Sequence, residues 1–182
     1  MRKSQTGRDG ADAPRSSATG PKGTLRRTTD LEEIIERLAA RIACDHVLVT
    51  MLFNARQVIL AHVSAEALEE AALALPIDFS ICRHTIERNG PLLISDTHVV
   101  PELAENGAVR DFGVRAYAGA PVIVGSEAGA AVCLLDKAPR DWRAADLADL
   151  EDTAREVAHH LRMDAALRPE REPTPARPAA PS

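Results

Sequence analysis

The chain has 182 residues, 45% of them hydrophobic, which suffices for one domain with a sizeable core and excludes a largely disordered protein. Its net charge of −5 is uneven, because residues 28–165 carry 12 basic and 23 acidic side chains, and such an acidic body repels the phosphate backbone of nucleic acids. No apolar run approaches the roughly 18 residues of a membrane span, and the 3 widely spaced cysteines favour a reducing cytoplasm over a disulfide framework.

Both ends of the chain lack apolar periodicity. Residues 1–27 hold 7 Lys/Arg and 2 Asp among Gly, Ser, Thr and Pro, which predicts a disordered basic leader. Residues 166–182 contain 5 of the 12 prolines and predict a disordered, extended tail. The sequence therefore predicts one folded domain over residues 28–165.

The first folded elements are predicted to be a helix and a hairpin. Asp30 can accept hydrogen bonds from free backbone amides at a helix start, and apolar residues recur at helical spacing over residues 31–42. Two apolar runs follow at residues 46–53 and 57–63, separated by Asn54-Ala55-Arg56. This spacing is typical of an antiparallel hairpin.

The middle of the chain is predicted to be mixed. A short helix is expected over residues 65–75, and another over residues 79–88, where Asn89-Gly90-Pro91 stops it. Residues 92–95 then predict a short strand. Residues 100–113 predict a crossover made of irregular and short helical pieces.

A second hairpin is the clearest local pattern in the sequence. Apolar runs at residues 117–124 and 130–135 flank GSEAG, a polar stretch with a glycine at each end that is predicted to be the turn. Residues 144–161 predict the last helix, which carries a heptad-like apolar seam from Leu147 to Leu161. Such a seam can dock on the protein's own sheet or pair with a second copy.

Two blocks of the sequence, FSICRHTIERNGPLLISD and RAYAGAPVIVGSEAGAAVCLLDKAPR, resemble the GAF domain family, in the subtype that reads C…I…PL…D…YAGAP…G…C…D…PR. The resemblance covers about residues 28–161. It implies an α+β, GAF/PAS-like fold with an antiparallel sheet of five or six strands. The terminal helices are expected on one face of the sheet, and the mixed helical crossover is expected to cover a ligand pocket on the other.

Seven residues are candidates for contact with a ligand in that pocket. Arginines can hold a carboxylate or phosphate through two hydrogen bonds, and a buried tyrosine needs a partner for its hydroxyl, which a ligand could supply. A glycine two residues after that tyrosine, on the same strand face, suggests room for a guest. The candidates are Phe79, Cys82, Arg83, Asp96, Phe112, Arg115 and Tyr117.

The cysteines raise an alternative function. Cys82 lies beside Arg83 and near His84, so it is either a reactive thiolate or a packed core residue. Cys44 and Cys133 are predicted to pack in the core as small hydrophobic residues. One GAF branch reduces free methionine sulfoxide with clustered cysteines in a loop between sheet and crossover. Residues 96–114 contain no cysteine, which argues against that activity.

The sequence lacks the patterns that are typical of GAF domains that bind bilins, cyclic nucleotides or metal ions. Bilin attachment pairs a cysteine with a histidine in the crossover, where this chain has only His98. The Asn-Lys-Phe-Asp-Glu pattern of cyclic-nucleotide GAF domains is absent, and the histidines show no metal-ligand spacing.

The sequence thus predicts a cytoplasmic, bacterial sensor domain without catalytic output of its own, which binds a small ligand or senses redox state. The ligand and any cofactor are left open. A homodimer through the terminal helices and a separate signalling partner protein are expected, with no nucleic acid or membrane bound by the folded domain. The alternative is a thiol-dependent reductase similar to free methionine sulfoxide reductase.

Overall fold

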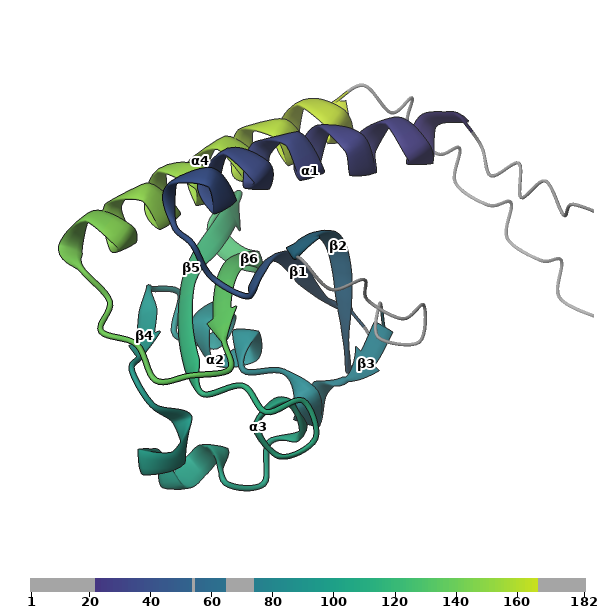
Figure 1. The fold of residues 1–182 in the computed structure, drawn as a ribbon. Coiled ribbons are helices and arrows are strands. Elements are labelled where there is room, and N and C mark those ends of the chain that lie inside the picture. Colours follow the sequence, from purple (N-terminus) through teal and green to yellow (C-terminus); the bar gives the residue numbers. More distant parts are fainter. Residues whose placement is uncertain (1–21, 54, 65–73, 167–182) are drawn as a thin grey trace, which may run out of the picture.

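A six-stranded antiparallel sheet organises the protein, which is described by a computed structural model over residues 22–53, 55–64 and 74–166 (Figure 1). The strand order is β3-β2-β1-β6-β5-β4, so both hairpins lie inside the sheet and short strands form its edges. The strands are β1 (His46–Phe53), β2 (Arg56–Ser64), β3 (Ala74–Pro76), β4 (Leu92–Ile94), β5 (Ala116–Val124) and β6 (Glu127–Asp136).

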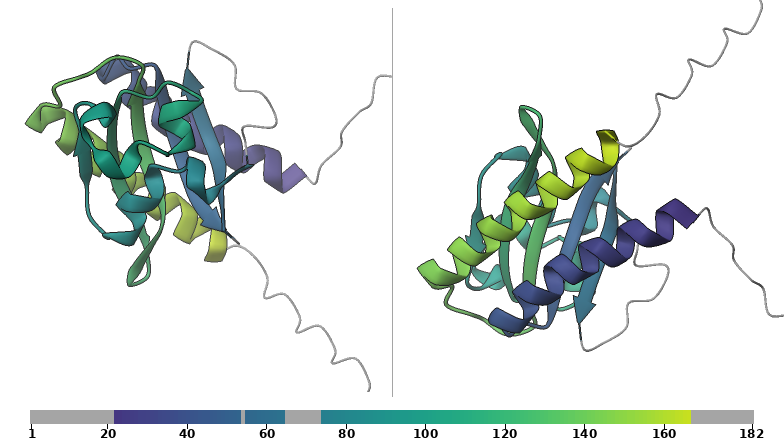
Figure 2. Two further views of the ribbon diagram at one scale, coloured as in Figure 1. Left: turned by 90° about the horizontal axis from the view of Figure 1, so that it is seen from below. Right: turned by 90° about the horizontal axis from the view of Figure 1, so that it is seen from above.

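Helices cover the two faces of the sheet differently. Helices α1 (Lys22–Arg41) and α4 (Ala144–Ala166) lie side by side on one face (Figure 2). Helix α2 (Cys82–Glu87) packs on the other face, followed by the crossover. The crossover consists of two single-turn 3-10 helices, Thr97–Val99 and Pro101–Leu103, and the short helix α3 (Gly107–Arg110). The predicted fold class is confirmed.

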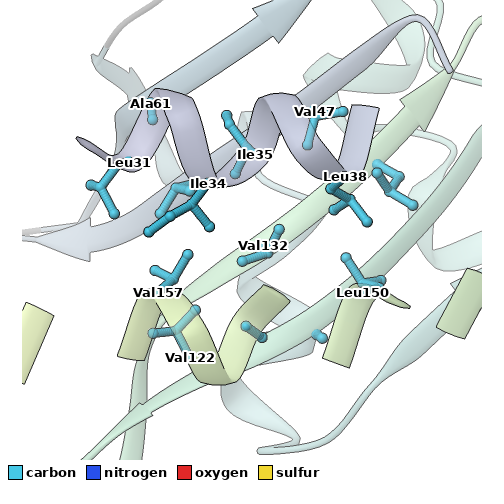
Figure 3. Packing of buried hydrophobic residues seen from close by; sticks show 14 of the residues in the cluster. Leu31, Ile34, Ile35, Leu38, Val47, Ala61, Val122, Val132, Leu150 and Val157 are labelled. Carbon is cyan, nitrogen blue, oxygen red and sulfur yellow. The ribbon is translucent and has the colours of Figure 1, made fainter. Parts of the chain in front are cut away.

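Alternation along β6 divides the core into two buried clusters. Val132 and Leu134 point toward α1 and α4, where they pack with residues such as Ile35 and Leu150 (Figure 3). Cys133 and its neighbours on the same strand face point the other way, into a second cluster beneath α2. This division is the one that strand periodicity predicts.

The apolar seam of α4 is used within the chain. Leu150 and Val157 are completely buried, and Ala154 is nearly so, in the cluster that α4 shares with α1 and the sheet. The seam therefore docks on the protein's own sheet. The homodimer stays a prediction, and residues other than these would have to form its interface.

Several predicted element boundaries were wrong. Helix α1 begins at Lys22, upstream of the predicted start at Asp30, because no proline interrupts the stretch between them. The domain limits at residues 28 and 165 stay predictions. The end of the predicted helix 65–75 is strand β3, and residues 65–73 lie outside the described residues. The predicted helix 79–88 is a 3-10 turn (Ile77–Phe79) followed by α2.

The turn between β5 and β6 is tighter than predicted. Only Gly125 and Ser126 form it, with Gly125 at a φ of +89° that favours glycine. The rest of the GSEAG stretch continues β6, where Glu127 pairs with Val124 and Ala128 with Ile123. These residues therefore form a strand because they pair with β5, although their composition is typical of a turn.

A bulge in β2 changes which residues face the side of the sheet that α2 covers. Val49 pairs with Ala61 and Thr50 with Ile59, so Leu60 is an extra residue. Leu60 and Ala61 both pack toward the helical layer, whereas Ile59 belongs to the cluster beneath α2. The bulge thus shifts the alternation by one residue, so that Ile59 before it and Ala61 after it face opposite layers.

Among the described residues, no helix is both long and apolar enough to cross a membrane.

Candidate functional site

A cavity of about 100 Å³ lies between the sheet and the segments that cover its second face. One wall comes from β1, β2 and β6, through Leu48, Ile59 and Leu135. The opposite wall comes from the residues around the 3-10 turn Ile77–Phe79 and from the crossover. Since a single buried water needs only about 10–15 Å³ measured in this way, the cavity is large enough for a small organic molecule.

Three of the predicted contact residues line this cavity: Phe79, Cys82 and Phe112. The rings of Phe79 and Phe112 are 5.9 Å apart between centroids and inclined by 52°, a favourable tilted arrangement. Gly107, at the start of α3, lies against Phe79, because a Cβ there would come within 2.3 Å of the ring. These contacts join the crossover to the cavity wall.

Tyr117 lies behind the cavity wall and does not line it. Its side chain is completely buried, and its hydroxyl is 2.7 Å from Thr85 Oγ1 and 3.2 Å from Cys133 Sγ. The space over Gly119 is filled by this tyrosine itself, since a Cβ on Gly119 would be 2.1 Å from Tyr117 Oη. The room expected for a guest beside Gly119 is therefore occupied by the protein.

Asp96 and Arg115 bind each other rather than facing the cavity. Arg115 donates to both carboxylate oxygens of Asp96, at 2.9 and 2.7 Å. Asp96 also accepts from the backbone N–H of His98, and the guanidinium lowers the pKa of its carboxyl to about 2. The pair fastens the start of the crossover to the start of β5.

Arg83 also lies outside the cavity lining. Its guanidinium is 3.9 Å from the exposed carboxylate of Asp78, and its backbone N–H donates to Ser80 Oγ. As contacts to a ligand, the seven predicted residues remain predictions; the structure brings only Phe79, Cys82 and Phe112 together at the cavity.

The sequence analysis missed a buried polar residue that lines the cavity. Gln57, at the start of β2, lines the cavity with its side chain almost fully buried, and its carboxamide Oε1 accepts no hydrogen bond from the described residues. A buried polar atom without a partner costs about 1–3 kcal/mol. A glutamine directly before the apolar run of β2 was the available sequence signal.

Charged and aromatic polar groups lie at one end of the cavity. His46, Asp136 and Lys137 also line it. Asp136 accepts from the backbone N–H of Asp45 at 2.8 Å and from Arg140 at 2.7 Å, so its carboxylate holds the end of β6 in place. This agrees with the structural role that the sequence favours for a strand-ending aspartate.

Two histidines stack beside the cavity. His46 Nδ1 and His62 Nε2 are 3.2 Å apart, and the ring centroids are separated by 5.5 Å. Burial, with the neighbouring His46 as a second cause, lowers the pKa of His62 to about 4 from the usual 6.5. Neutral His62 is therefore the form that the folded protein accommodates.

Replacing His62 with glutamine is expected to make the free energy of unfolding less dependent on pH under acidic conditions. The unfolded chain protonates this imidazole near pH 6.5 but the folded protein only near pH 4, so acidification across this window favours unfolding. Urea midpoints at several pH values between about 7 and about 4 measure the effect. A residual slope is expected from His84, whose pKa burial also lowers. His98→Gln, at an exposed position, is the control. If it reduced the pH dependence of stability as much as His62→Gln does, the effect could not be assigned to His62.

Cys82 on the cavity wall is in contact with a second thiol. Cys133, on β6, donates to Cys82 Sγ with a sulfur–sulfur distance of 2.9 Å, and both side chains are buried. This hydrogen bond lowers the pKa of Cys82, whereas burial raises the pKa of Cys133 well above its usual value. The predicted core packing of Cys133 is confirmed, and its contact with Cys82 was not foreseen.

A metal site is not evident in the described ranges, where no three His, Cys, Asp or Glu side chains gather closely enough to hold an ion.

The family model of the GAF domain matches residues 27–161. The chain belongs to the GAF domain family. GAF domains are a family of ligand-binding signalling domains, and the cavity lies between sheet and crossover, where the resemblance implied a pocket.

Solved GAF structures share this fold at low sequence identity. The blue-light absorbing form of the PixJ GAF domain from Thermosynechococcus elongatus superposes with a TM-score of 0.66 at 17% identity, covering 82% of this chain and 93% of that one. The type II free methionine-R-sulfoxide reductase from Thermoplasma acidophilum gives 0.63 at 14% identity, covering 78% and 96%. The GAF domain of an Acinetobacter phosphoenolpyruvate-protein phosphotransferase also gives 0.63, at 13% identity, covering 82% and 96%.

No curated protein sequence matches the chain. These likenesses therefore establish the GAF fold, which serves both a photoreceptor and a reductase among the neighbours, and leave the ligand to be argued from the cavity itself.

Proposed function

We propose that this GAF domain is a sensor that binds a small, mainly apolar molecule carrying one hydrogen-bond donor. The observation that carries the proposal is the unpaired Gln57 Oε1, buried in the wall of a mainly apolar cavity. A ligand N–H or O–H would satisfy this acceptor and remove the penalty of leaving it unpaired. The donor requirement is thus the specificity that the cavity offers.

The walls support an apolar body for the ligand. Leu48, Ile59 and Leu135 form one side and the tilted pair Phe79 and Phe112 another. Phe112 is 46% exposed although it lines the cavity, so a guest would cover part of its ring. Burying apolar surface contributes about 25 cal/mol per Å², which makes a flat aromatic or aliphatic molecule the favoured class.

Indole and indene test the proposal as a matched pair, because they have nearly the same shape and only indole carries an N–H. Indole is expected to raise the unfolding temperature of the wild-type protein more than indene at equal concentration. The preference should correspond to about 0.5–1.5 kcal/mol, the net contribution of one hydrogen bond, or roughly a threefold to tenfold difference in dissociation constant.

Gln57→Leu is the variant that isolates the acceptor. It removes the carboxamide while keeping a similar volume, so indole and indene should bind it equally. Gln57→Glu keeps an acceptor and should retain the preference for indole. An indole preference that survives Gln57→Leu would contradict the role of Oε1, and a wild-type protein that neither compound stabilises would contradict an apolar cavity ligand.

The cellular setting of this proposal is a cytoplasmic, bacterial sensor that passes ligand occupancy to a separate partner protein. The widely spaced cysteines support a reducing compartment, and the acidic folded part argues against binding of nucleic acid. A homodimer would follow the common symmetric solution for such domains. Because α4 turns its seam inward, the exposed faces of α1 and α4 are where a second copy would bind.

A thiol-dependent reductase is the second candidate function. It is favoured by the contact between Cys82 and Cys133 at the cavity wall, and a free methionine-R-sulfoxide reductase is among the proteins of similar fold. Turnover of free methionine sulfoxide with thioredoxin and NADPH separates the two candidates. Catalytic consumption of NADPH that depends on Cys82 would establish the reductase and remove the claim of a non-catalytic domain.

A further inference from the structure

We propose that Cys82 and Cys133 form a reversible dithiol–disulfide pair, oxidised by hydroperoxides that enter through the ligand cavity. The inference rests on the proposed function in one respect, because the same cavity serves as the entrance. It adds a second input to the domain, so that the site would respond to oxidants as well as to a ligand.

The two sulfur atoms are already in contact. They are 2.9 Å apart, and a disulfide bond of about 2.05 Å needs them to approach by roughly 0.9 Å more. Cys82 is the first residue of α2, which packs directly on β6, where Cys133 lies. A small movement of this short helix toward the sheet would supply the approach.

The two cysteines occupy unequal positions. Cys82 lines the cavity, so a small oxidant in the cavity reaches its sulfur first. Cys133 is not part of the cavity lining, and its sulfur contacts both Cys82 Sγ and the Tyr117 hydroxyl. Cys82 is therefore the attacking sulfur, and Cys133 is the resolving thiol behind it.

Hydrogen-bond donors surround Cys82 as an attacking thiolate would require. Cys133 donates to it, and this hydrogen bond is the main cause that lowers the pKa of Cys82. Thr50 lies beside both Cys82 and Cys133, and its buried Oγ1 has no hydrogen-bond partner within the described part of the chain, so its O–H is available to a charged sulfur. Thiolate character is what makes a cysteine reactive toward peroxides.

The chemistry balances in two steps. The Cys82 thiolate attacks one peroxide oxygen, so that an S–O bond forms and the O–O bond breaks. The thiolate becomes a sulfenic acid, and the hydroxide that leaves takes up one proton to become water. The Cys133 thiol then attacks the sulfenic sulfur, so that the S–S bond forms, the S–O bond breaks, and the thiol proton leaves with the hydroxyl as water. The sulfur pair loses two electrons in total, and hydrogen peroxide is the oxidant that gains them.

Mass spectrometry of the full chain tests this directly. The reduced protein is treated with hydrogen peroxide, quenched with N-ethylmaleimide under denaturing conditions and digested with trypsin. Cleavage after Lys and Arg places Cys82 in peptide 57–83, Cys133 in peptide 116–137 and Cys44 in peptide 42–56. We expect a cross-linked pair of the first two peptides, lighter by two hydrogens than the sum of the reduced peptides, which dithiothreitol separates again.

Cys44 is the internal control. It is partly buried away from the pair, and burial raises the pKa of its thiol to about 12. Its thiol should react with peroxide at least about tenfold more slowly than that of Cys82, because thiolate character controls the rate. A disulfide that includes Cys44, or loss of the Cys44 thiol before that of Cys82, would overturn the proposal.

Two variants assign the roles. Cys133→Ser should accumulate a Cys82 sulfenic acid that dimedone traps, whereas Cys82→Ser should leave Cys133 reduced over the same time. The reverse pattern overturns the assigned order of attack. The wild-type cross-link does not depend on either variant folding, so its absence at peroxide levels that oxidise Cys82 to higher acids overturns the pairing.

Saturating indole separates this proposal from the ligand proposal. Slower wild-type cross-linking with indole, and not with glycerol, supports entry through the cavity. A cross-link formed at an unchanged rate while indole still stabilises the protein overturns entry through the cavity and leaves ligand binding intact. A cross-link in a protein that indole never stabilises contradicts the ligand proposal alone.

Discussion

Leu150→Glu is expected to unfold the protein. Leu150 is completely buried between α4 and the sheet, in the cluster with Ile35, Leu38 and Val132. Removing a buried leucine side chain alone costs about 2–5 kcal/mol, and an unpaired buried carboxylate adds about 3–5 kcal/mol more. Their sum is comparable with the whole free energy of unfolding of a typical domain, about 5–15 kcal/mol.

Circular dichroism and urea denaturation measure this outcome. The matched control is Ala148→Glu, which places the same charge at an exposed position of the same helix and should unfold like the wild type. A folded, monomeric Leu150→Glu derived from a dimeric wild type would show instead that the seam pairs two copies and that α4 does not dock as described.

Gly119→Ala is the second substitution with a large expected effect, a loss of about 2–4 kcal/mol. A Cβ at this position would lie 2.1 Å from Tyr117 Oη and 2.6 Å from Thr85 Oγ1. Tyr117 is completely buried and cannot swing away, so the overpacking costs about 1–3 kcal/mol, and the Tyr117–Thr85 hydrogen bond is strained as well. The unfolding temperature should fall by roughly 10 °C.

Gly129→Ala is the control in the neighbouring strand, because a Cβ there meets no described atom within 4 Å. Calorimetry should give it an unfolding temperature close to that of the wild type. Tyr117→Phe combined with Gly119→Ala should recover part of the loss, since it removes the nearest clashing atom. Wild-type stability of Gly119→Ala would mean that the ring of Tyr117 does not lie over this glycine.

Much of the fold could be predicted from local pattern. Val132, Cys133 and Leu134 lie in an apolar run that was predicted to be a strand, and they alternate between the two layers because strand side chains alternate between faces. The order of hairpins and terminal helices also followed from apolar periodicity. The predictions failed where pairing partners decide the outcome. Strand β3 exists because it pairs with the start of β2, and the GSEAG stretch became strand because β5 pairs with it.

The candidate site was harder to predict. Phe79, Cys82 and Phe112 were expected at the cavity and line it, although Phe79 precedes α2 rather than belonging to it. Gln57 was missed because regular alternation would place it on the same face of the sheet as Ala61 and Val63. The bulge at Leu60 separates them, and an apolar strand carries no clear sequence signal for a bulge. Tyr117 and Gly119 were placed on the correct strand face. Their relation to each other, ring over glycine, required three-dimensional packing to recognise.

The bulge at Leu60 also constrains the length of the chain. It is the residue that lets Gln57 and Ile59 face the cavity while Ala61 and Val63 face α1 and α4. Deleting one residue at the bulge would make the ladder regular, and Gln57 and Ala61 would still face the layers that they face now. Inserting one residue there would instead reverse the facing of β2 on one side of the insertion. In descendants of this sequence, deletions should therefore be tolerated at the bulge, whereas insertions should avoid the middle of β2 and gather at its ends.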